Sequence, residues 1–432
     1  MLTNAVQRNK ILKIYTEALG SVKGDICVKK HLESEQFKIH FKNTEKVAIL
    51  AIGKASQSMA QGAYEVLHKI IISGLVVTKE NHLSTGSLID GFEYIESSHP
   101  IPSQKSLDAG KKIIDFVSGL PADTHLIVLI SGGASSLVEY TKPTVSLDDL
   151  IQVNDWLISS GLGIEEINNI RQKLSIIKAG QLAAFAKHLK VSNLLLSDVL
   201  SNNPAYIGSG LFVESTPQKI NNIKLPAWLD AVLASCESPK SEASQTEPYK
   251  YNIDTQLVAT NTTLLKNIAT LCKSNENQNA HIIEEPLSAN VEIEADKIAA
   301  QIIKGDSGYY IWGGEPTVDM SKGSGSATKD NVSVNKGGRN QHLALLVAKK
   351  IKAMDNLIVL CIGTDGTDGT TDNAGALVDG NTLSRGDTEG LDIEEHLETF
   401  NSAAFLQVSG DVINTGPTGT NVMDVVIAYK WE

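Results

Sequence analysis

Short apolar runs that alternate with helix-like segments constrain this chain more than any other feature. Runs of five or six apolar residues stand at 126–130 and 47–52, and each precedes a segment with helical periodicity. Such runs are typical of strands that are buried on both faces of a parallel sheet. The alternation therefore predicts an α/β protein with a mainly parallel sheet covered by helices on both faces.

The length of the chain predicts two domains, because 432 residues exceed one ordinary hydrophobic core. A polar, proline-flanked stretch at 238–248 is typical of a surface excursion near a domain boundary, although an ordinary loop insertion has the same composition. We therefore expect one domain over residues 1–250 and a second over 251–432. A glycine- and serine-rich tract at 321–328 predicts a mobile loop.

Charge and composition exclude several classes of protein. The formal net charge of −12 argues against nucleic acid or an anionic membrane as a partner. The four cysteines lack the spacing of a metal site, and two lie in apolar stretches, which favours reduced thiols in a cytoplasmic protein. The first residues lack the hydrophobic core of a signal peptide, and no apolar run reaches membrane-spanning length.

Glycine and aspartate dominate residues 363–372, which follow the apolar run 357–362. We expect that run to be a buried parallel strand, so Asp365, Asp368 and Asp372 would lie at its carboxyl end, where open α/β sheets bind ligands. Carboxylate oxygens suit a hard cation or sugar-like hydroxyls. A surface turn that uses Asp and Gly only for its geometry is the alternative.

Two loops in the first half could bind an anion. Lys54 stands beside the expected start of a helix, whose free amides attract phosphate or carboxylate, although an ordinary helix cap beside a solvated lysine is equally consistent. The loop Ser131-Gly132-Gly133-Ala134-Ser135 follows a buried strand, and its amides could cradle phosphate oxygens. Neither loop has the glycine spacing of a Walker loop or a dinucleotide fingerprint.

Further polar residues stand where strands or turns end. His99 follows an expected strand and could face substrate, although hydrogen bonding to the backbone is the simpler interpretation. Arg171, Ser175 and Lys178 would share one face of a helix expected over 165–187. Asp198 suits metal ligation or a turn. Arg339 opens a helix, against the preference of the helix dipole for cations at the other end, which suggests that it grips an anion.

These parts together are those that phosphoryl transfer requires. Backbone amides hold phosphates, carboxylates hold Mg²⁺, and Lys or Arg stabilises the charge on the transferred group. Composition and spacing alone do not identify the molecule that accepts the phosphoryl group.

The chain resembles the glycerate 2-kinase family with a C-terminal MOFRL domain, some members of which carry the name hydroxypyruvate reductase. The most specific matches are Gly337 to Gln341, Gly363 to Asp372, and Thr415 to Asn421. The resemblance implies ATP-dependent phosphorylation of D-glycerate to 2-phospho-D-glycerate with Mg²⁺. It also implies a cleft between a Rossmann-like N-terminal domain and a smaller α/β MOFRL-type domain. Glycerate and ATP would be the partners of a cytoplasmic monomer or homodimer.

The resemblance also implies roles for individual residues. The catalytic set is Lys54, Arg339, Asp198 and Asp365, of which Asp198 and Asp365 are the metal candidates. The nucleotide loop is Ser131, Gly132, Gly133, Ala134 and Ser135. The residues expected to bind substrate are Gly53, Ser56, His99, Glu315, Asn340, Asp368 and Asn421.

The chain departs from the family pattern in a few places. Asn202 and Asn203 replace two carboxylates, Gln181 replaces an arginine, and Ala134 replaces a glycine of the nucleotide loop. An amide ligates a cation less strongly than a carboxylate. A ligand-binding homologue with weakened catalysis is therefore one alternative. A nicotinamide-dependent hydroxypyruvate reductase is another, and it requires a dinucleotide fingerprint that the sequence lacks.

Overall fold

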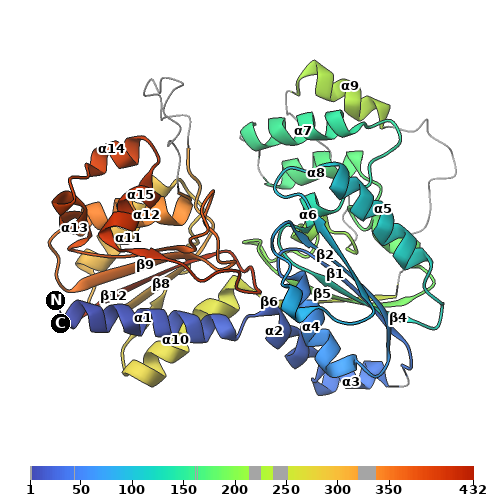
Figure 1. Cartoon of the computed structure of the whole chain (residues 1–432), viewed down its shortest axis with the longest axis horizontal. Coiled ribbons are helices and arrows are strands. Elements are labelled where there is room, and N and C mark those ends of the chain that lie inside the picture. Colours follow the sequence, from blue (N-terminus) through green and yellow to red (C-terminus); the bar gives the residue numbers. More distant parts are fainter. Residues whose placement is uncertain are drawn as a thin grey trace. The chain divides into compact units, whose positions relative to one another are not determined.

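The computed structural model describes residues 2–42, 44–160, 162, 164–213, 225–236, 252–319 and 337–432. The stretches at 238–248 and 321–328 lie outside these residues. The chain forms two compact units (Figure 1). The N-terminal unit comprises Lys23–Ala259, and the C-terminal unit comprises Met1–Val22 with Thr260–Glu432. Within the described ranges, no helix combines the length and apolarity needed to cross a bilayer.

The sheet of the N-terminal unit has six strands in the order β3-β2-β1-β4-β5-β6, and all neighbours are parallel. This order confirms the predicted parallel sheet. From β1 the next strands are added towards one edge of the sheet, and from β4 they are added towards the other edge. The position between β1 and β4 is therefore a topological switch point. The strands are β1 (Val47–Ile52), β2 (Ile71–Lys79), β3 (Phe92–Ser97), β4 (His125–Ile130), β5 (Lys190–Leu196) and β6 (Ile253–Ala259).

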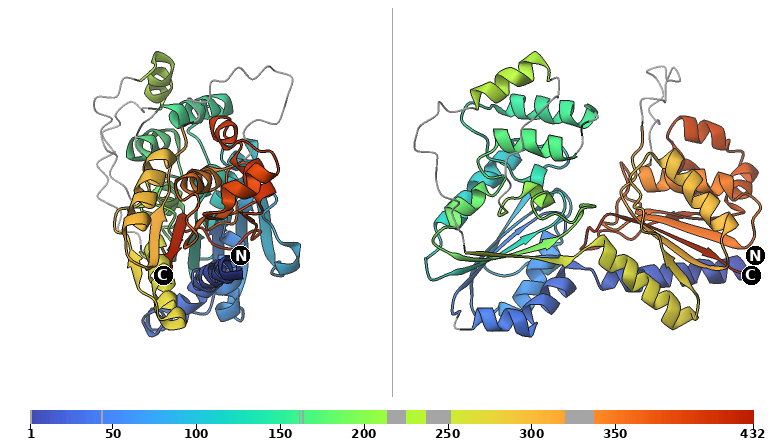
Figure 2. Two further views of the ribbon diagram at one scale, coloured as in Figure 1. Left: turned by 90° about the vertical axis from the view of Figure 1, so that its left-hand side faces the viewer. Right: turned by 180° about the vertical axis from the view of Figure 1, so that it is seen from behind.

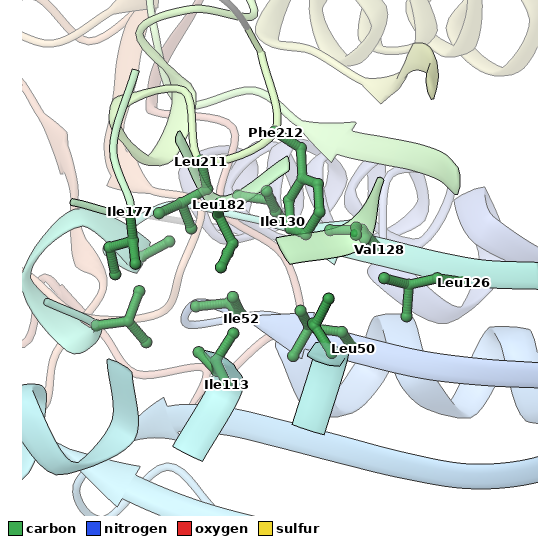
Figure 3. Packing of buried hydrophobic residues seen from close by; sticks show 14 of the residues in the cluster. Leu50, Ile52, Ile113, Leu126, Val128, Ile130, Ile177, Leu182, Leu211 and Phe212 are labelled. Carbon is green, nitrogen blue, oxygen red and sulfur yellow. The ribbon is translucent and has the colours of Figure 1, made fainter. Parts of the chain in front are cut away.

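Helices cover both faces of this sheet because its central strands are apolar on both sides. Side chains alternate along β1, so Leu50 and Ile52 pack towards Ile113 of α5 (Gln104–Ser118), together with residues of β4 (Figure 3). The opposite face of β1 is covered by α4 (Ser56–Leu67), with α2 (Gly24–Leu32) beside it. The remaining helices are α3 (Glu35–Phe41), α6 (Ala134–Leu137), α7 (Leu147–Ser159), α8 (Ile164–Leu174) and α9 (Ala227–Ser235), and the short 3-10 turns are η1 (Thr85–Ser87), η2 (Gln181–Ala186) and η3 (Ile207–Ser209).

The long helix expected over 165–187 is wrong, since α8 ends at Leu174. Ala179 and Gly180 have φ values of 56° and 79°, which no right-handed helix accommodates. Their amides donate instead to Ser209 O and Gly210 O, at 3.0 and 2.6 Å. Backbone hydrogen bonds to a distant segment thus replace those of a continuous helix.

The sheet of the C-terminal unit has six strands in the order β11-β10-β9-β12-β8-β7. The expectation of a parallel strand at 357–362 is wrong, because β9 (Leu357–Gly363) pairs antiparallel with both neighbours, although its burial is as expected. Residues 364–374 join β9 to β10, and this connection is shorter than the crossover that parallel strands require. The other strands are β7 (Ala280–Ile282), β8 (Gly308–Gly314), β10 (Gly375–Asp379), β11 (Val412–Ile413) and β12 (Asp424–Lys430).

Helices also cover both faces of the second sheet. Figure 2 shows α1 (Leu2–Gly20) and α10 (Asn261–Glu276) together on one face. The helices α11 (Val291–Lys304) and α12 (Arg339–Lys350) lie on the other. The remaining helices are α13 (Thr382–Thr388), α14 (Ile393–Glu398) and α15 (Ser402–Ser409).

The first helix of the chain belongs to the C-terminal unit. The bounds of the two units therefore differ from the expected domain boundary between residues 250 and 251. Ile11 and Ile14 of α1 are buried. Arg8 forms ion pairs with Asp379 at 3.0 Å and Asp411 at 2.8 Å, and both aspartates are buried. Apolar burial and these ion pairs tie α1 to strands encoded at the other end of the chain.

Candidate functional site

The loops that follow β1 and β4 contact one another at the switch point of the N-terminal unit. Lys54 N donates to Gly132 O at 2.9 Å, and Ala55 N donates to Ser131 Oγ at 3.0 Å. A Cβ on Gly53 would lie 2.2 Å from Ser131 Oγ, and Gly53 has φ +128°, so only glycine fits there. Lys54 and Ser131 to Gly133 therefore form one cluster, which we call the lysine site.

His99 belongs to the same cluster. A Cβ on Gly133, which has φ +85°, would lie 3.0 Å from Cδ2 of His99 and 3.4 Å from Cγ of Lys54. Three segments that the sequence predicted separately thus meet around Gly133. The missing Cβ of Gly133 is what allows the imidazole and the lysine stem to approach the loop so closely.

Two serines predicted for the site have partners within the fold. Ser56 Oγ donates to Val77 O at 2.9 Å and is fully buried, so its hydroxyl anchors the start of α4 to β2. Ser135 Oγ lies 2.7 Å from Ser209 Oγ, which joins the glycine loop to the segment 207–210. Asp198 lies two residues after the end of β5 and is half-buried at the same carboxyl edge of the sheet.

The predicted cationic face around 171–178 is wrong as a helix face, since Ser175 and Lys178 follow the end of α8. Lys178 Nζ lies 2.5 Å from Glu139 Oε2 in a fully buried ion pair, and Ser175 Oγ donates to Glu139 Oε1 at 2.5 Å. Burial lowers the pKa of Lys178, while Glu139 opposes that shift. Arg171 Nε donates to Asn154 at 2.9 Å. These contacts join α7, the segment after α8 and the chain after β4.

In the C-terminal unit, Arg339 is the first residue of α12. Its Nε donates to Asp424 Oδ2 at 2.5 Å and its Nη2 donates to Asp424 Oδ1 at 3.0 Å. Nη1 forms an ion pair with Glu315 at 3.0 Å. Burial alone would lower the pKa of Arg339, but Asp424 and Glu315 raise it on balance, so the guanidinium stays charged. We call these residues the arginine site.

Asp368 fixes the main chain that carries Arg339. Its Oδ1 accepts from Asn340 N at 3.1 Å and its Oδ2 accepts from Gln341 N at 2.8 Å, while both amide side chains donate to it as well. The carboxylate thus caps the free amides at the start of α12. Burial raises the pKa of Asp368 to about 6, while the backbone hydrogen bonds oppose that shift.

Two glycines allow this cap to form. A Cβ on Gly338 would lie 2.2 Å from Asp368 Oδ1, and a Cβ on Gly369 would lie 2.3 Å from Gly337 O. The glycine pair before Arg339 and the glycine after Asp368 are therefore needed for two backbones to pack closely. Asp368 and Asn340, expected to bind substrate, both contribute here to holding the helix start.

The other acidic and polar residues of the C-terminal motifs differ in environment. Asp365 Oδ1 accepts from Thr367 N at 3.1 Å and from its hydroxyl at 3.2 Å, which closes the turn after β9. Asp372 is exposed. Asn421 is buried to a relative exposure of 9% and lies three residues before Asp424.

Asp424 is the residue of the arginine site that sequence reasoning missed. It is the first residue of β12, which is otherwise apolar until Tyr429, and its relative exposure is 1%. A carboxylate at the start of a buried strand is rarely left unpaired, and that signal could have identified it. Its partner Arg339 lies 85 positions away in the sequence, so the pairing itself could not be read.

The described residues fit a Mg²⁺ that arrives with a nucleotide better than a resident ion. Among them, no group of three or more His, Cys, Asp or Glu could hold a metal. Mg²⁺ in phosphoryl-transfer enzymes needs only one or two protein carboxylates, because phosphates and water supply its other ligands. Asp198 and Asp365 each offer such a carboxylate, one in each unit.

Comparison with known proteins agrees with the motifs. Residues 10–228 match a domain of unknown function, DUF4147, and residues 308–424 match the MOFRL family. The chain is 35% identical to D-glycerate 2-kinase of Thermotoga maritima, over 89% of this chain and 91% of that protein. It is 32% identical to glycerate 2-kinase of Pyrococcus horikoshii, over 89% and 87% of the two chains. The crystal structure of glycerate kinase from Thermotoga maritima superposes with a TM-score of 0.80 at 30% identity, covering 99% of this chain and 100% of that one. This chain therefore belongs to the glycerate 2-kinase family.

Proposed function

We propose that this protein transfers the γ-phosphoryl group of ATP to the 2-hydroxyl of D-glycerate, which yields ADP and 2-phospho-D-glycerate. The observation that carries the proposal is the lysine site: Lys54 and a glycine loop meet at the switch point of a Rossmann-type sheet. Ligands of open α/β sheets bind at that position. The names of the relatives supply the acceptor.

Different residues supply the separate functions that phosphoryl transfer requires. The amides of Ser131 to Ser135 hold phosphate oxygens, and Lys54 neutralises negative charge on the γ-phosphoryl group. Asp198 accepts the proton of the glycerate hydroxyl, whose oxygen forms the new bond to phosphorus. The bond to the bridging oxygen breaks, and its electron pair leaves with ADP.

We assign Arg339, in the C-terminal unit, to the stabilisation of negative charge on the transferring phosphoryl group. Positive charge that is fixed before the reaction stabilises the transition state more than charge that must reorganise. Mg²⁺, when bound with the nucleotide, would neutralise phosphate charge, and Asp365 would supply a carboxylate ligand. Asp198 is the other candidate ligand, in which case it would not also accept the hydroxyl proton.

Release of ADP from purified protein tests the proposal, with D-glycerate, tartronate and related hydroxy acids as acceptors. Phosphorus-coupled NMR of the product separates the 2-phosphate from the 3-phosphate. Lys54→Ala and Arg339→Ala should each lower kcat/KM by about 100- to 1,000-fold, as loss of one preorganised charge does. Exposed Lys111→Ala is the matched control. Near-normal activity of either site variant would refute its assignment.

The alternative reductase is tested in the same preparation. The strand order is that of dinucleotide-binding sheets, yet the loop after β1 reads Gly53-Lys54-Ala55-Ser56 and lacks the glycine fingerprint. Loss of reduced-nicotinamide absorbance with hydroxypyruvate would favour the reductase. Binding of ATP without ADP release on any hydroxy acid would favour a homologue with weakened catalysis.

A further inference from the structure

Asp424 lies at the first position of β12, between two strand ends that carry no side chain. It is in register with Gly314 of β8 and with Gly363 of β9. A Cβ on Gly363 would lie 3.4 Å from Asp424 Oδ1. The carboxylate therefore lies beside the backbone of two glycines.

The backbone before Asp424 adopts an uncommon conformation that hydrogen bonds maintain. Met423 has φ +66°, which few residues other than glycine adopt. Its carbonyl accepts from Thr364 N at 3.1 Å and from Thr364 Oγ1 at 2.6 Å. Asn261 Nδ2 donates to the carbonyl of Asp424 at 3.0 Å. Local strain of this kind persists where surrounding contacts over-determine it, and it is common at functional sites.

The hydrogen bonds of Arg339 to Asp424 use the edge of its guanidinium formed by Nε and Nη2. Nε and Nη2 donate to the two oxygens of Asp424, and Nη1 pairs with Glu315. One N–H on each terminal nitrogen then has no partner in the part of the chain that the structure describes. Such a fork matches two oxygens of a phosphate or carboxylate.

We propose that Asp424 is a positioning residue, which orients the fork of Arg339 towards an oxyanion, the transferring phosphoryl group. This assignment rests on the proposed kinase function. Asp368 fixes the main chain of Arg339 and Asp424 fixes its guanidinium, so two buried carboxylates hold both ends of one side chain.

The charges around Arg339 indicate that Asp424 orients the guanidinium and does not strengthen its binding of anions. Asp424, Glu315 and Asp368 all raise the pKa of the guanidinium, so their negative charge reduces its pull on anions in solution. Asp424→Asn should therefore leave KM for ATP and glycerate unchanged or lower it. The same variant should lower kcat by about 100-fold, as a misplaced catalytic group does. Loss of folded protein would also lower the apparent kcat at unchanged KM, so chemical rescue and NMR are needed to separate a positioning role from a structural defect.

Chemical rescue tests the inference directly. Guanidinium ion added to Arg339→Ala should restore part of kcat, because the carboxylate of Asp424 binds and orients it. The double variant Arg339→Ala/Asp424→Asn should show no rescue, whereas Arg339→Ala/Glu398→Gln, the matched control at an exposed carboxylate of the same unit, should keep it. Equal rescue in both double variants would overturn the role of Asp424.

NMR of the arginine side chains gives a readout that needs no turnover. The chain has four arginines, so Arg339 is assigned by the loss of its signals in Arg339→Lys. We expect separate Nη1 and Nη2 signals for Arg339 in the wild type and one averaged signal in Asp424→Asn. An averaged signal in the wild type would overturn the inference, even if Asp424→Asn does not fold. Absence of ADP release by the wild type with any hydroxy acid would instead overturn the proposed function.

Discussion

Replacement of Gly338 by alanine should disturb the arginine site without removing any charged group. The added Cβ would lie 2.2 Å from Asp368 Oδ1 and 2.4 Å from the carbonyl carbon of Asp368. The second atom belongs to the backbone, so a side-chain rotation cannot relieve the overlap. Normal carbon contacts begin near 3.5 Å, so the Asp368 turn must move by about 1 Å.

The cost of this movement follows from the hydrogen bonds of Asp368. The carboxylate accepts from two backbone amides and two side-chain amides of Asn340 and Gln341. A buried donor that loses its acceptor costs about 1–3 kcal/mol, and overpacking costs a similar amount. We expect the free energy of unfolding to fall by about 2–4 kcal/mol. A displacement of Arg339 by about 1 Å should lower kcat by about 100-fold.

Urea unfolding and steady-state kinetics of Gly338→Ala measure these two quantities separately. Gly86→Ala is the matched control, because no atom lies within 4 Å of its added Cβ. That control should change the free energy of unfolding by less than about 0.5 kcal/mol. Wild-type kcat in Gly338→Ala would refute the idea that the close packing of Gly338 on Asp368 positions Arg339.

Three further predictions concern stability and the lysine site. Arg8→Leu removes two ion pairs to buried aspartates and should lower the free energy of unfolding by about 2–3 kcal/mol in urea. The loss is limited because Arg385 still pairs with the same two aspartates, and an unchanged midpoint would contradict this prediction. Burial lowers the pKa of His125 to about 4, so its stabilising contribution, complete above the unfolded pKa of about 6.5, is lost as pH falls towards 4. His125→Asn should flatten that pH dependence of unfolding, and an unaltered slope would count against it. Ser131→Ala should cost about 1–3 kcal/mol, because Ala55 N loses its buried acceptor; Ser136→Ala is the control, and equal losses in the urea midpoint would argue against the bridge.

The apolar runs predicted the strands well because burial on both faces leaves a clear pattern in the sequence. Strand direction in the C-terminal sheet was not predictable, since a buried strand such as β9 has the same composition with parallel or antiparallel neighbours. Contacts between distant positions were also hidden. Arg8 and Asp379 are 371 positions apart, and nothing local in α1 indicates that it packs on the last third of the chain.

The candidate site shows a similar division between what local pattern can and cannot indicate. Glycine loops after β1 and β4 were recognisable because each follows its own strand, and their meeting follows from the strand order. The role of Asp368 was not recognisable, because its partners in α12 lie 27 and 28 positions earlier. A motif rich in Asp and Gly therefore contains carboxylates with different roles, and only their contacts in the structure distinguish those roles.

The departures from the family pattern acquire a local explanation in the structure. Gln181 Nε2 donates to Ser175 O at 3.1 Å and to Lys178 O at 2.9 Å, so its amide caps the turn after α8. Asn202 has φ +51°, a conformation that asparagine tolerates better than most residues. Asn203 Oδ1 accepts from Ala205 N at 3.0 Å, a hydrogen bond that an aspartate would make equally well. Each amide is thus accounted for by turn geometry. Since these amides were the motive for a homologue with weakened catalysis, that alternative now depends on the ADP-release assay alone.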